Sequence, residues 1–507
     1  MSLPSIGRNK HCSAFASTKV SQPAPVLVLI ILAIVLHDPN LPLTATIATA
    51  SPAYNYIFLT LILPMKRENL PFPVAIPNVK IHADRRKRLA KNLKEGLVLL
   101  ATAPEATRNA DAHYDYRWDS HFYYLTGFRE AEAVLAIVLG KKPRHILFCR
   151  DKNLEREIWD GFRFGPHGAK DVVSFDEAYS FSELETRSPD LMANQGVVYT
   201  PIGASQEWDH SITRWLNVVR GKSRAGIAAP AELRDLRSSV GQMRLIKDAA
   251  EIDIMARAGK ISSGAHARAM GYAKPGMFEY QIEAELLHEF VKNGARQPAY
   301  GSIVAAGGNA CVLHYRENSA QLKKGDLMLI DAGCELESYA ADITRTFPIA
   351  GKFSGPQKDI YELVLASQLA CIKAVKPGVP FGRYHEVANE VLAQGLIDLK
   401  LCKGSLSSVL EKETYKQFYM HRAGHWLGLD VHDAGDYKRD GKFVALEAGM
   451  VLTVEPGLYI RPADNVPKNF WDIGVRIEDD ILVTAKGNLN LTASCPKLVK
   501  DVEALTC

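Results

Sequence analysis

The sequence predicts two large domains, an α/β domain followed by an α+β domain. At 507 residues the chain is too long for one hydrophobic core. Between residues 85 and 237 apolar runs of strand length alternate with helical stretches, whereas beyond residue 241 helices alternate with strands and hairpins. We therefore predict domains over 65–240 and 241–507, preceded by an N-terminal segment of different character.

That segment, residues 1–64, contains a single acidic residue, Asp38, and an apolar run from Val26 to Leu36. A helix over this run spans about 16 Å, against roughly 30 Å of bilayer hydrocarbon, so it is short for a transmembrane helix. Three interpretations stay open: a targeting segment for export or an organelle that ends near Ala50, a membrane anchor, or an extension upstream of a true start at Met65. We favour the third, which predicts a cytoplasmic protein with no firm membrane partner.

Four apolar runs in the first domain predict strands of one sheet, and one stretch predicts a helix over 211–222. The strand runs are 95–104, 132–140, 144–150 and 196–203. A long helix over 244–270, ending before Lys274-Pro275-Gly276, is expected to open the second domain. Further helices are expected over 279–294, 355–375 and 383–396.

Composition excludes several classes of function. The formal charge of +4 is small, and basic residues are interleaved with acidic ones, so we expect no nucleic-acid partner. Eight cysteines without a CxxC pair predict free thiols, buried or idle, in a reducing compartment rather than a disulfide framework or a zinc ribbon. GxSxG, HExxH, P-loop and GxGxxG motifs are absent from the sequence.

Two aspartates mark the chemistry of the second domain. An apolar strand runs into Asp331, and a following strand carries Asp342. If this hairpin turns between Leu336 and Glu337, the two aspartates face each other on one side of the sheet. Their repulsion at about 5 Å is roughly 3 kcal/mol at an effective dielectric constant of 20. We therefore expect a cation between them.

Three further polar residues stand in apolar surroundings: His425, Glu455 and Glu478. Buried carboxylates of this kind are costly unless they are paired or bound to metal. One imidazole and four carboxylates make an oxygen-rich site, which suits manganese, or cobalt or iron, better than structural zinc. Because one divalent ion leaves four carboxylates undercompensated, we expect two ions, which can share a hydroxide.

These segments resemble the pita-bread metallopeptidases, and specifically the Xaa-Pro aminopeptidase (aminopeptidase P) branch. The resemblance covers most of residues 85–495 and includes "GNACVLHYREN", "DAGCE…DITRTFP", "HWLGLDVHD", "EPGLYI" and "RIEDDILVT". It implies a C-terminal pita-bread (creatinase/aminopeptidase) catalytic domain preceded by a creatinase-type α/β domain. It also implies hydrolysis of the bond between an N-terminal residue and a following proline.

The resemblance implies metal roles for all five residues. Asp331 is expected to bind one ion, Asp342 and Glu478 to bridge both, and His425 and Glu455 to complete the second. A bridging hydroxide is the expected nucleophile, and Glu455 the group that carries its proton to the leaving proline nitrogen.

Further residues match positions around the metals in this branch. His432 is expected to steady the scissile carbonyl, and His314 and His421 to shape the proline pocket and carry protons. Arg476 is expected to orient a carboxylate or a substrate group. Tyr300 matches a position near the metals, with a tyrosine of the hydrophobic core as the alternative.

In the first domain, Asp111 and Trp159 match residues that in bacterial relatives approach an active site across a subunit contact. A homo-oligomer, a dimer or a tetramer, is therefore implied, although either residue can also be a surface or core residue. His113 and His121 lack nearby acids in a ligand pattern, so we expect both at the surface.

Two alternatives stay open. Prolidase shares the fold and the ligands but hydrolyses Xaa-Pro dipeptides, and a non-catalytic pita-bread protein would serve as a binding scaffold. Retention of all five ligands disfavours the scaffold.

Overall fold

The computed structural model describes residues 45–47, 59–61, 78–349 and 351–506. The chain divides into two compact units, residues 1–71 and 72–507. In the first unit β1 (Ala45–Ile47) pairs antiparallel with β2 (Leu59–Leu61). The apolar run at 26–36 and the expected cleavage region near Ala50 lie outside the described residues.

None of the helices within the described ranges combines the length and apolar character needed to cross a bilayer.

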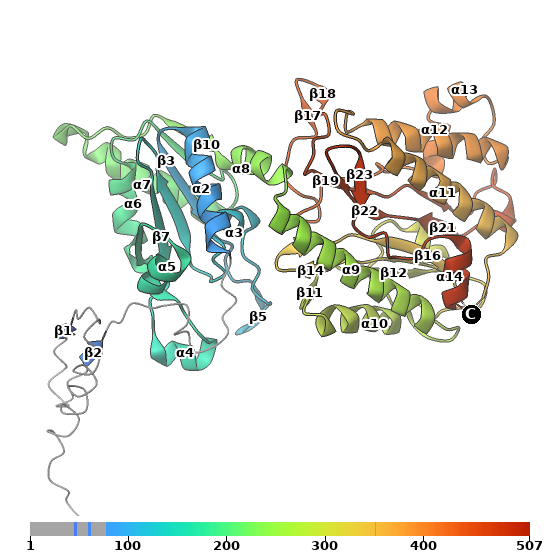
Figure 1. Cartoon of the computed structure of the whole chain (residues 1–507), viewed down its shortest axis with the longest axis horizontal. Helices are drawn as coiled ribbons and strands as arrows, with labels where there is room; N and C mark the ends of the chain where they lie inside the picture. Colours follow the sequence, from blue (N-terminus) through green and yellow to red (C-terminus); the bar gives the residue numbers. More distant parts are fainter. Residues whose placement is uncertain (1–44, 48–58, 62–77, 350, 507) are drawn as a thin grey trace, which may run out of the picture. The chain divides into compact units, whose positions relative to one another are not determined.

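The first half of the second unit is built on a six-stranded mixed sheet with the order β10-β9-β3-β6-β7-β8 (Figure 1). Its strands are β3 (Leu97–Ala101), β6 (Val134–Val138), β7 (Arg144–Cys149), β8 (Glu177–Ser180), β9 (Val197–Thr200) and β10 (Glu232–Asp235). The four predicted strands are confirmed. We did not predict β8 and β10, because these sheet-edge strands are largely exposed or half-buried and so carry little apolar signal.

Helices bury this sheet. Trp215 and Leu216 of α7 pack against Leu97 and Val134 of the central strands, within one core cluster. The helices are α2 (Val79–Leu93), α3 (Ser120–Thr126), α4 (Leu154–Asp160), α5 (Gly165–Val173), α6 (Leu184–Met192) and α7 (Gln206–Gly221). The helix predicted over 211–222 is confirmed as the second part of α7. The expected α/β character of this part of the chain is likewise confirmed.

Two helices rather than one connect the halves, which corrects the single helix predicted from residue 244. α8 (Leu236–Leu245) ends before a short extended segment, and α9 (Ala249–Tyr272) begins after it. Asp248 starts α9 with a capping box: its carboxylate accepts from the backbone N–H of Glu251, whose own carboxylate accepts from the N–H of Asp248. This reciprocal pair fixes where the second helix begins.

The second half has α+β architecture with short antiparallel sheets between helices. Its strands are β11 (Gln297–Pro298), β12 (Ile303–Ala306), β13 (Leu327–Asp331), β14 (Cys334–Leu336), β15 (Tyr339–Ala340), β16 (Thr344–Pro348), β17 (Lys438–Arg439), β18 (Lys442–Phe443), β19 (Val451–Val454), β20 (Gly457–Ile460), β21 (Ile473–Arg476), β22 (Asp479–Val483) and β23 (Asn488–Asn490). The α-helices after α9 are α10 (Glu279–Lys292), α11 (Gly355–Ala374), α12 (Arg383–Asp398), α13 (Leu406–Glu411) and α14 (Val499–Thr506). The three helices predicted after residue 279 are confirmed.

The strands lie between two helix pairs, α9 with α10 and α11 with α12 (Figure 1). One continuous core cluster joins these helices to the strands, from Ala258 on α9 to Leu392 on α12. This is the layered arrangement expected of the pita-bread class.

The hairpin register differs from the prediction. Asp331 pairs with Thr344, and the turn lies between Glu337 and Ser338, one residue later than expected. Both turn residues have positive φ, 49° and 77°, as two-residue hairpin turns require, although neither is the Gly or Asn that usually marks such a turn. Asp342 is therefore a diagonal neighbour of Asp331, two residues along the opposite strand, and still on the same face.

The prediction of free, buried thiols is confirmed for the cysteines in the described ranges. These are Cys149, Cys311, Cys334, Cys371, Cys402 and Cys495.

Candidate active site

A cleft with a volume of about 1350 Å³ opens on the strands of the second half. All five predicted metal ligands line it, as do the five residues predicted around them. These ten are Tyr300, His314, Asp331, Asp342, His421, His425, His432, Glu455, Arg476 and Glu478. The fold thus brings together residues that lie up to 178 positions apart in the chain.

Strand ends place the carboxylates. Asp331 is the last residue of β13, Glu455 follows β19 directly, and Glu478 lies between β21 and β22. Glycines permit the close approach of neighbouring chain: a Cβ on Gly333 would lie 1.8 Å from the carbonyl oxygen of Ala341. The backbone can cross next to Asp342 only because that side chain is missing.

Asp342, His425 and Glu478 form the tightest group, with ligand atoms all within 4.8 Å of one another. Nε2 of His425 lies 3.5 Å from Oδ2 of Asp342 and 3.6 Å from Oε1 of Glu455. Nδ1 of His425 lies 3.0 Å from the carbonyl oxygen of Trp426, which can only accept, so Nδ1 is the donor. In the neutral ring the Nε2 lone pair then points at carboxylates, which is the orientation of a metal ligand.

Asp331 belongs to the same group through Tyr300. The Tyr300 hydroxyl lies 2.6 Å from Oδ1 of Asp331 and 2.5 Å from Oδ1 of Asp342. A hydroxyl carries one proton and donates to only one of these oxygens, so two carboxylates crowd a single donor. The residues present therefore fit a divalent cation, which would relieve this crowding.

One arginine compensates part of this negative charge. Nη2 of Arg476 lies 2.6 Å from Oδ2 of Asp331, and its Nε and Nη1 donate to Thr344 and Tyr459. Thr344 in turn donates to Oε2 of Glu478 at 2.6 Å. Sequence reasoning missed Thr344 and Tyr459, although Thr344 stands two residues after Asp342 and so shares its face of the strand.

Burial shapes the pKa values of these carboxyl groups. It raises the pKa of Glu455 to about 7, with His425 and Arg476 opposing the shift. Burial, and then the charge of Asp342, raise the pKa of Glu478 well above its usual range. Burial opposes protonation of His425, but its hydrogen bond to Asp342 and the charge of Glu455 raise its pKa to about 9. Without a metal ion, this group holds protons that a cation would displace.

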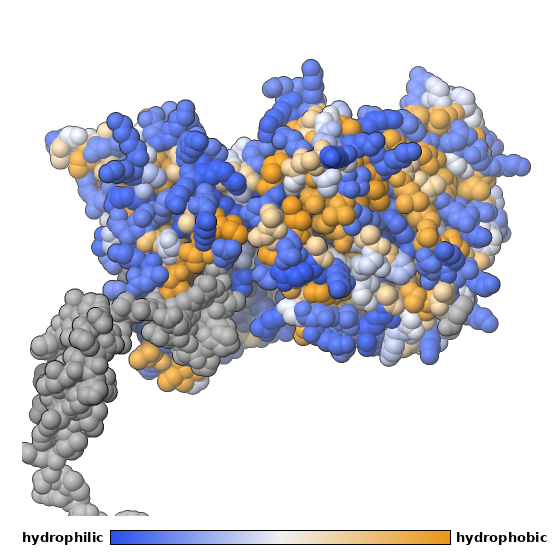
Figure 2. Space-filling view, in the orientation of Figure 1, coloured by the Kyte–Doolittle hydropathy of each residue, from blue (hydrophilic) through white to orange (hydrophobic). Residues whose placement is uncertain are grey.

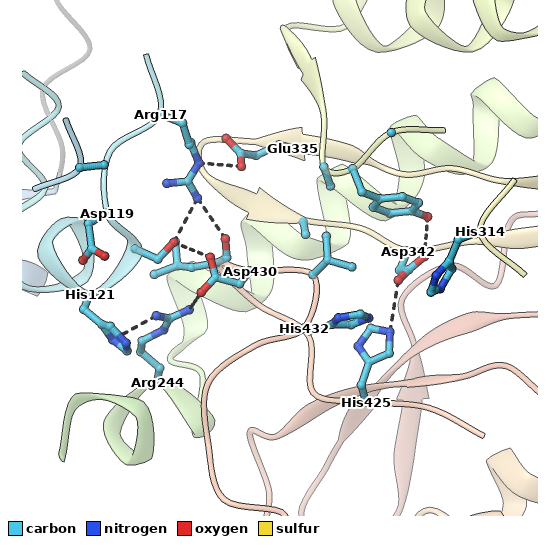
Figure 3. A pocket seen from close by; sticks show the side chains of 18 of the residues that line it. Arg117, Asp119, His121, Arg244, His314, Glu335, Asp342, His425, Asp430 and His432 are labelled. Carbon is cyan, nitrogen blue, oxygen red and sulfur yellow. Dashed lines mark hydrogen bonds and ion pairs between the residues drawn. The ribbon is translucent and has the colours of Figure 1, made fainter. Parts of the chain in front are cut away.

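Three histidines surround the group, and Figure 3 shows His314 and His432 on either side of Asp342 and His425. The His432 ring meets the His425 ring edge-on, with centroids 4.3 Å apart. Nε2 of His421 lies 2.8 Å from the Tyr459 hydroxyl. Its Nδ1 lies 4.0 Å from Oε2 of Glu455 and within hydrogen-bonding distance of the Arg422 carbonyl. Burial and Arg476 lower the pKa of His421 to about 3, so its ring is neutral.

The far wall of the cleft comes from the first half of the unit, a contribution that the sequence did not predict. Arg117 donates to Glu335 at 2.8 Å and to the Leu429 carbonyl, and Ser120 donates to Asp430 at 2.6 Å (Figure 3). These bonds fasten the first half to the loop that carries His432. No motif marks these residues, because each contact joins positions more than 200 apart.

The surface location predicted for His121 is wrong. Its Nδ1 lies 3.1 Å from Nη1 of Arg244, and it is half-buried in the cleft wall. Burial and the Arg244 charge lower its pKa. The prediction failed because Arg244, which supplies the contact, is 123 residues away. His113 is exposed, as predicted.

Asp111 and Trp159 do not line the cleft, and both are exposed. Trp159 is 80% and Ile158 is 81% exposed on α4, none of whose residues is buried. Figure 2 shows apolar side chains gathered at α4. The subunit contact implied for Trp159 stays a prediction.

Comparison with known proteins agrees with this geometry. Residues 253–485 match metallopeptidase family M24, and residues 82–199 match the aminopeptidase P N-terminal domain. The Xaa-Pro aminopeptidase of Escherichia coli is 44% identical over 424 residues, covering 83% of this chain and 96% of that protein. The chain therefore belongs to metallopeptidase family M24 and, within it, to the Xaa-Pro aminopeptidases.

Solved structures give the same result. Pseudomonas aeruginosa aminopeptidase PepP is 47% identical, with a TM-score of 0.83 over 84% of this chain and 98% of that one. A zinc-substituted E. coli aminopeptidase P in complex with product is 43% identical, with a TM-score of 0.82 and the same coverage. The chain is thus a hydrolase of the metallo-aminopeptidase class, and its family implies divalent metal ions.

Proposed function

We propose that this chain removes the N-terminal residue from peptides whose second residue is proline, using two divalent metal ions. The observation that carries the proposal is the convergence of the five predicted metal ligands in one cleft, in a chain that is 44% identical to the Xaa-Pro aminopeptidase of E. coli. Two divalent ions would balance the four carboxylates, whose buried negative charge the single arginine Arg476 leaves undercompensated.

Asp331, Asp342, His425, Glu455 and Glu478 would hold the ions, with Asp342 and Glu478 shared between them. Manganese is the proposed metal, since oxygen donors outnumber nitrogen donors four to one and no thiolate is present in the set. When bound, such ions activate a water molecule and polarise the scissile carbonyl. Tyr300 and Arg476 hold Asp331 in place through its two oxygens.

Glu455 is the proposed proton carrier. It lies mostly buried at the cleft wall, and its pKa of about 7 in the metal-free protein shows how little its surroundings favour the charged form. A carboxylate so placed can accept a proton from the attacking water and release it to the leaving proline nitrogen. His421, which is neutral and has its Nδ1 4.0 Å from Oε2 of Glu455, is proposed to line the proline pocket beside this carboxylate.

His432 and His314 are proposed to bind substrate. Both are exposed at the cleft wall, on either side of Asp342 and His425 (Figure 3). His432, in contact with His425, would donate to the oxyanion that forms from the scissile carbonyl. His314 would face the proline ring together with His421.

The size of the cleft favours peptides over dipeptides. Its lining continues from the carboxylates past Arg117 and Ser120 to Ser205 and Trp208 on the first half of the unit. A volume of about 1350 Å³ is larger than most small-molecule sites and leaves room for residues beyond the proline.

The testing experiment compares substrate length. We expect purified protein loaded with manganese to cleave an Xaa-Pro-Xaa tripeptide, with little turnover of the matching Xaa-Pro dipeptide. Elemental analysis of the loaded protein should give close to two ions per chain. Cleavage of the dipeptide alone would establish a prolidase instead, and absence of both bound metal and turnover would indicate a binding scaffold.

We further propose a homo-oligomer that α4 helps to form. Leu154, Ile158 and Trp159 are exposed apolar residues on this helix, which is unusual for a free surface. Light scattering of the native protein and of Trp159→Ala tests this: the proposal requires a mass above one chain for the native protein and a smaller mass for the variant.

A further inference from the structure

Two of the six arginines that line the cleft stand apart from the others. Four are paired with carboxylates: Arg117 with Glu335, Arg237 with Asp235, Arg244 with Asp430 and Asp433, and Arg476 with Asp331. Arg316 and Arg422 are exposed, and neither guanidinium has an ion pair or hydrogen bond to any described residue. Each guanidinium therefore has five N–H donors that are free to bind a ligand in the cleft.

Both arginines belong to segments fastened to one strand, β20. Nη2 of Arg461, just beyond this strand, donates to the carbonyl oxygen of Cys311 at 2.7 Å and so holds the segment that leads to Arg316. The backbone N–H of Tyr459 donates to the carbonyl of Phe418 at 2.9 Å and holds the segment that leads to Arg422. The two cations thus come from chain segments anchored two residues apart.

The same segments carry two of the substrate histidines. Arg316 follows His314 by two residues, and Arg422 follows His421 directly. His314 and His421 both line the cleft. The unpaired arginines therefore flank the pair of histidines that we place around the proline.

The length of an extended peptide relates the two arginines to the bond that is cleaved. Nδ1 of His421 lies 4.0 Å from Oε2 of Glu455, beside the bond to be cleaved. An extended peptide advances about 3.3–3.6 Å per residue, so the third residue of a substrate lies roughly 7 Å past that bond. The third residue of a substrate is therefore the one expected to pass the two histidines and meet the arginines that follow them in the sequence.

We propose that Arg316 and Arg422 form a carboxylate-binding subsite for the residue that follows the proline. The proposal rests on the proposed function of the cleft. Two sources supply the same chemistry: the C-terminal carboxylate of a tripeptide, and an aspartate or glutamate side chain at the third position. An arginine binds either group through two parallel hydrogen bonds. The subsite makes the enzyme favour short or acidic peptides over neutral ones.

The experiment compares substrates that differ only in this charge. The first pair is Ala-Pro-Ala with a free C-terminus and its C-terminal amide, and the second is Ala-Pro-Asp-amide and Ala-Pro-Asn-amide. For the manganese-loaded native protein we expect kcat/KM to be about three- to tenfold higher for the charged member of at least one pair, since exposed charge-assisted bonds are individually modest. The preference should appear in KM and should shrink as salt rises from 50 to 500 mM.

Variants of the two arginines test whether the preference for the charged substrate depends on them. Arg422→Gln and Arg316→Gln should each reduce the preference, and the double variant should bring it close to one. Arg224→Gln is the matched control, because Arg224 is also exposed and has no side-chain partner among the described residues, but lies outside the cleft. It should keep the full preference.

The outcomes separate the subsite from the proposed function. Equal kcat/KM within both pairs, or a preference that survives in the double variant, overturns the subsite while turnover of the amides upholds the aminopeptidase. A preference in the first pair alone assigns the subsite to the chain terminus, and one in the second pair alone assigns it to an acidic side chain.

A binding measurement tests the subsite in the case that no tripeptide is cleaved. Calorimetry with the product dipeptide Pro-Ala and its amide reports the subsite without turnover. Tighter binding of Pro-Ala by the native protein, lost in the double variant, upholds the subsite even if no tripeptide is cleaved. Equal binding of the two dipeptides together with no cleavage overturns both.

Discussion

Two sets of buried carboxylates in this protein contrast sharply. The first set, called the catalytic carboxylates after their proposed role, is Asp331, Asp342, Glu455 and Glu478, and the paired carboxylates are Asp433 and Asp479. In the second set each aspartate has two basic partners: Asp433 bonds Arg244 and Lys247, and Asp479 bonds Arg345 and Lys497. In the first set one arginine, Arg476, serves the whole group.

Their pKa values move in opposite directions. Burial raises the pKa of both, but Arg345 and Lys497 outweigh it and hold the pKa of Asp479 at about 2. Lys247 and Arg244 likewise lower the pKa of Asp433. For Glu455 burial prevails, and its pKa is about 7. Burial thus has opposite outcomes in the two sets: Asp479 is bonded to two cations, whereas the charges of Asp342 and Asp331 add to the effect of burial at Glu455.

The difference between the two sets indicates where a metal ion would bind. A side-chain cation next to a buried carboxylate makes a permanent structural pair, whereas a carboxylate group short of cations is one that a divalent ion can complete.

The largest expected effect is the loss of catalysis in Asp342→Asn. Removing the charge shared by the proposed ions should lower kcat/KM on an Xaa-Pro-Xaa tripeptide by at least about 10³-fold, or roughly 4 kcal/mol of transition-state stabilisation. Elemental analysis should show fewer than two ions per chain, and circular dichroism an unchanged fold. Asp253→Asn, exposed on α9, is the matched control and should keep full activity. Native metal content and activity in Asp342→Asn would remove Asp342 from the site.

Asp433→Asn should instead affect stability. It leaves the buried Arg244 and Lys247 without their shared carboxylate, which costs about 3–5 kcal/mol. Urea unfolding should show this loss, whereas Asp253→Asn should change the free energy of unfolding by less than about 0.5 kcal/mol. A change below about 1 kcal/mol in Asp433→Asn would mean that the pair is not structural.

The catalytic carboxylates should make the metal-free protein less stable as pH rises. The pKa of Glu455 is about 7 in the folded protein, above its ordinary value of 4.5. Protonation of Glu455 therefore stabilises the folded state fully below pH 4.5, and this stabilisation is lost as pH rises through 7. The loss is about 3 kcal/mol by pH 7. Urea unfolding after chelation should show a stability difference between native protein and Glu455→Gln that changes with pH over this window. Added manganese should abolish the dependence, and a dependence unaffected by metal would contradict the assignment.

Asp479 should show the opposite and smaller dependence. Its folded pKa of about 2 lies below its ordinary value of 3.8, so its contribution is complete above pH 3.8 and is lost as pH falls through 2. Between pH 5 and pH 2 the native protein should lose about 2 kcal/mol more than Asp479→Asn. Manganese should leave this difference unchanged, because Asp479 has its own cations. Equal losses in the two proteins would show that the ion pair contributes nothing.

Much of the site was visible in the sequence because its chemistry is local. Glu455 and Glu478 stand at the ends of apolar strands, and a carboxylate in that place needs a partner whatever the rest of the fold does. The same reasoning predicted that Asp331 and Asp342 need a cation. Elements such as β3 and α11 were predicted for a similar reason, since their apolar residues lie within a single segment.

The sequence did not reveal which side chains these residues contact. Tyr300 was recognised by resemblance, but nothing in the sequence indicated that its hydroxyl joins Asp331 and Asp342. The His121–Arg244 contact and the Ser120–Asp430 contact join distant positions in the same way. A side chain that is polar and intermediate in burial has no periodic signal to reveal its partner.

The sequence by itself determined which residue types meet: an oxygen-rich set of five ligands, in an α+β domain, behind an α/β domain. The tertiary structure decided how they meet. It moved the hairpin turn to Glu337 and Ser338, so that Asp331 faces Thr344 rather than Asp342, and it left Arg316 and Arg422 unpaired while four other arginines found carboxylates. The physical reason is that strand register and ion pairing depend on backbone dihedral angles and long-range contacts, which hydrophobic pattern constrains only to the correct face of a sheet.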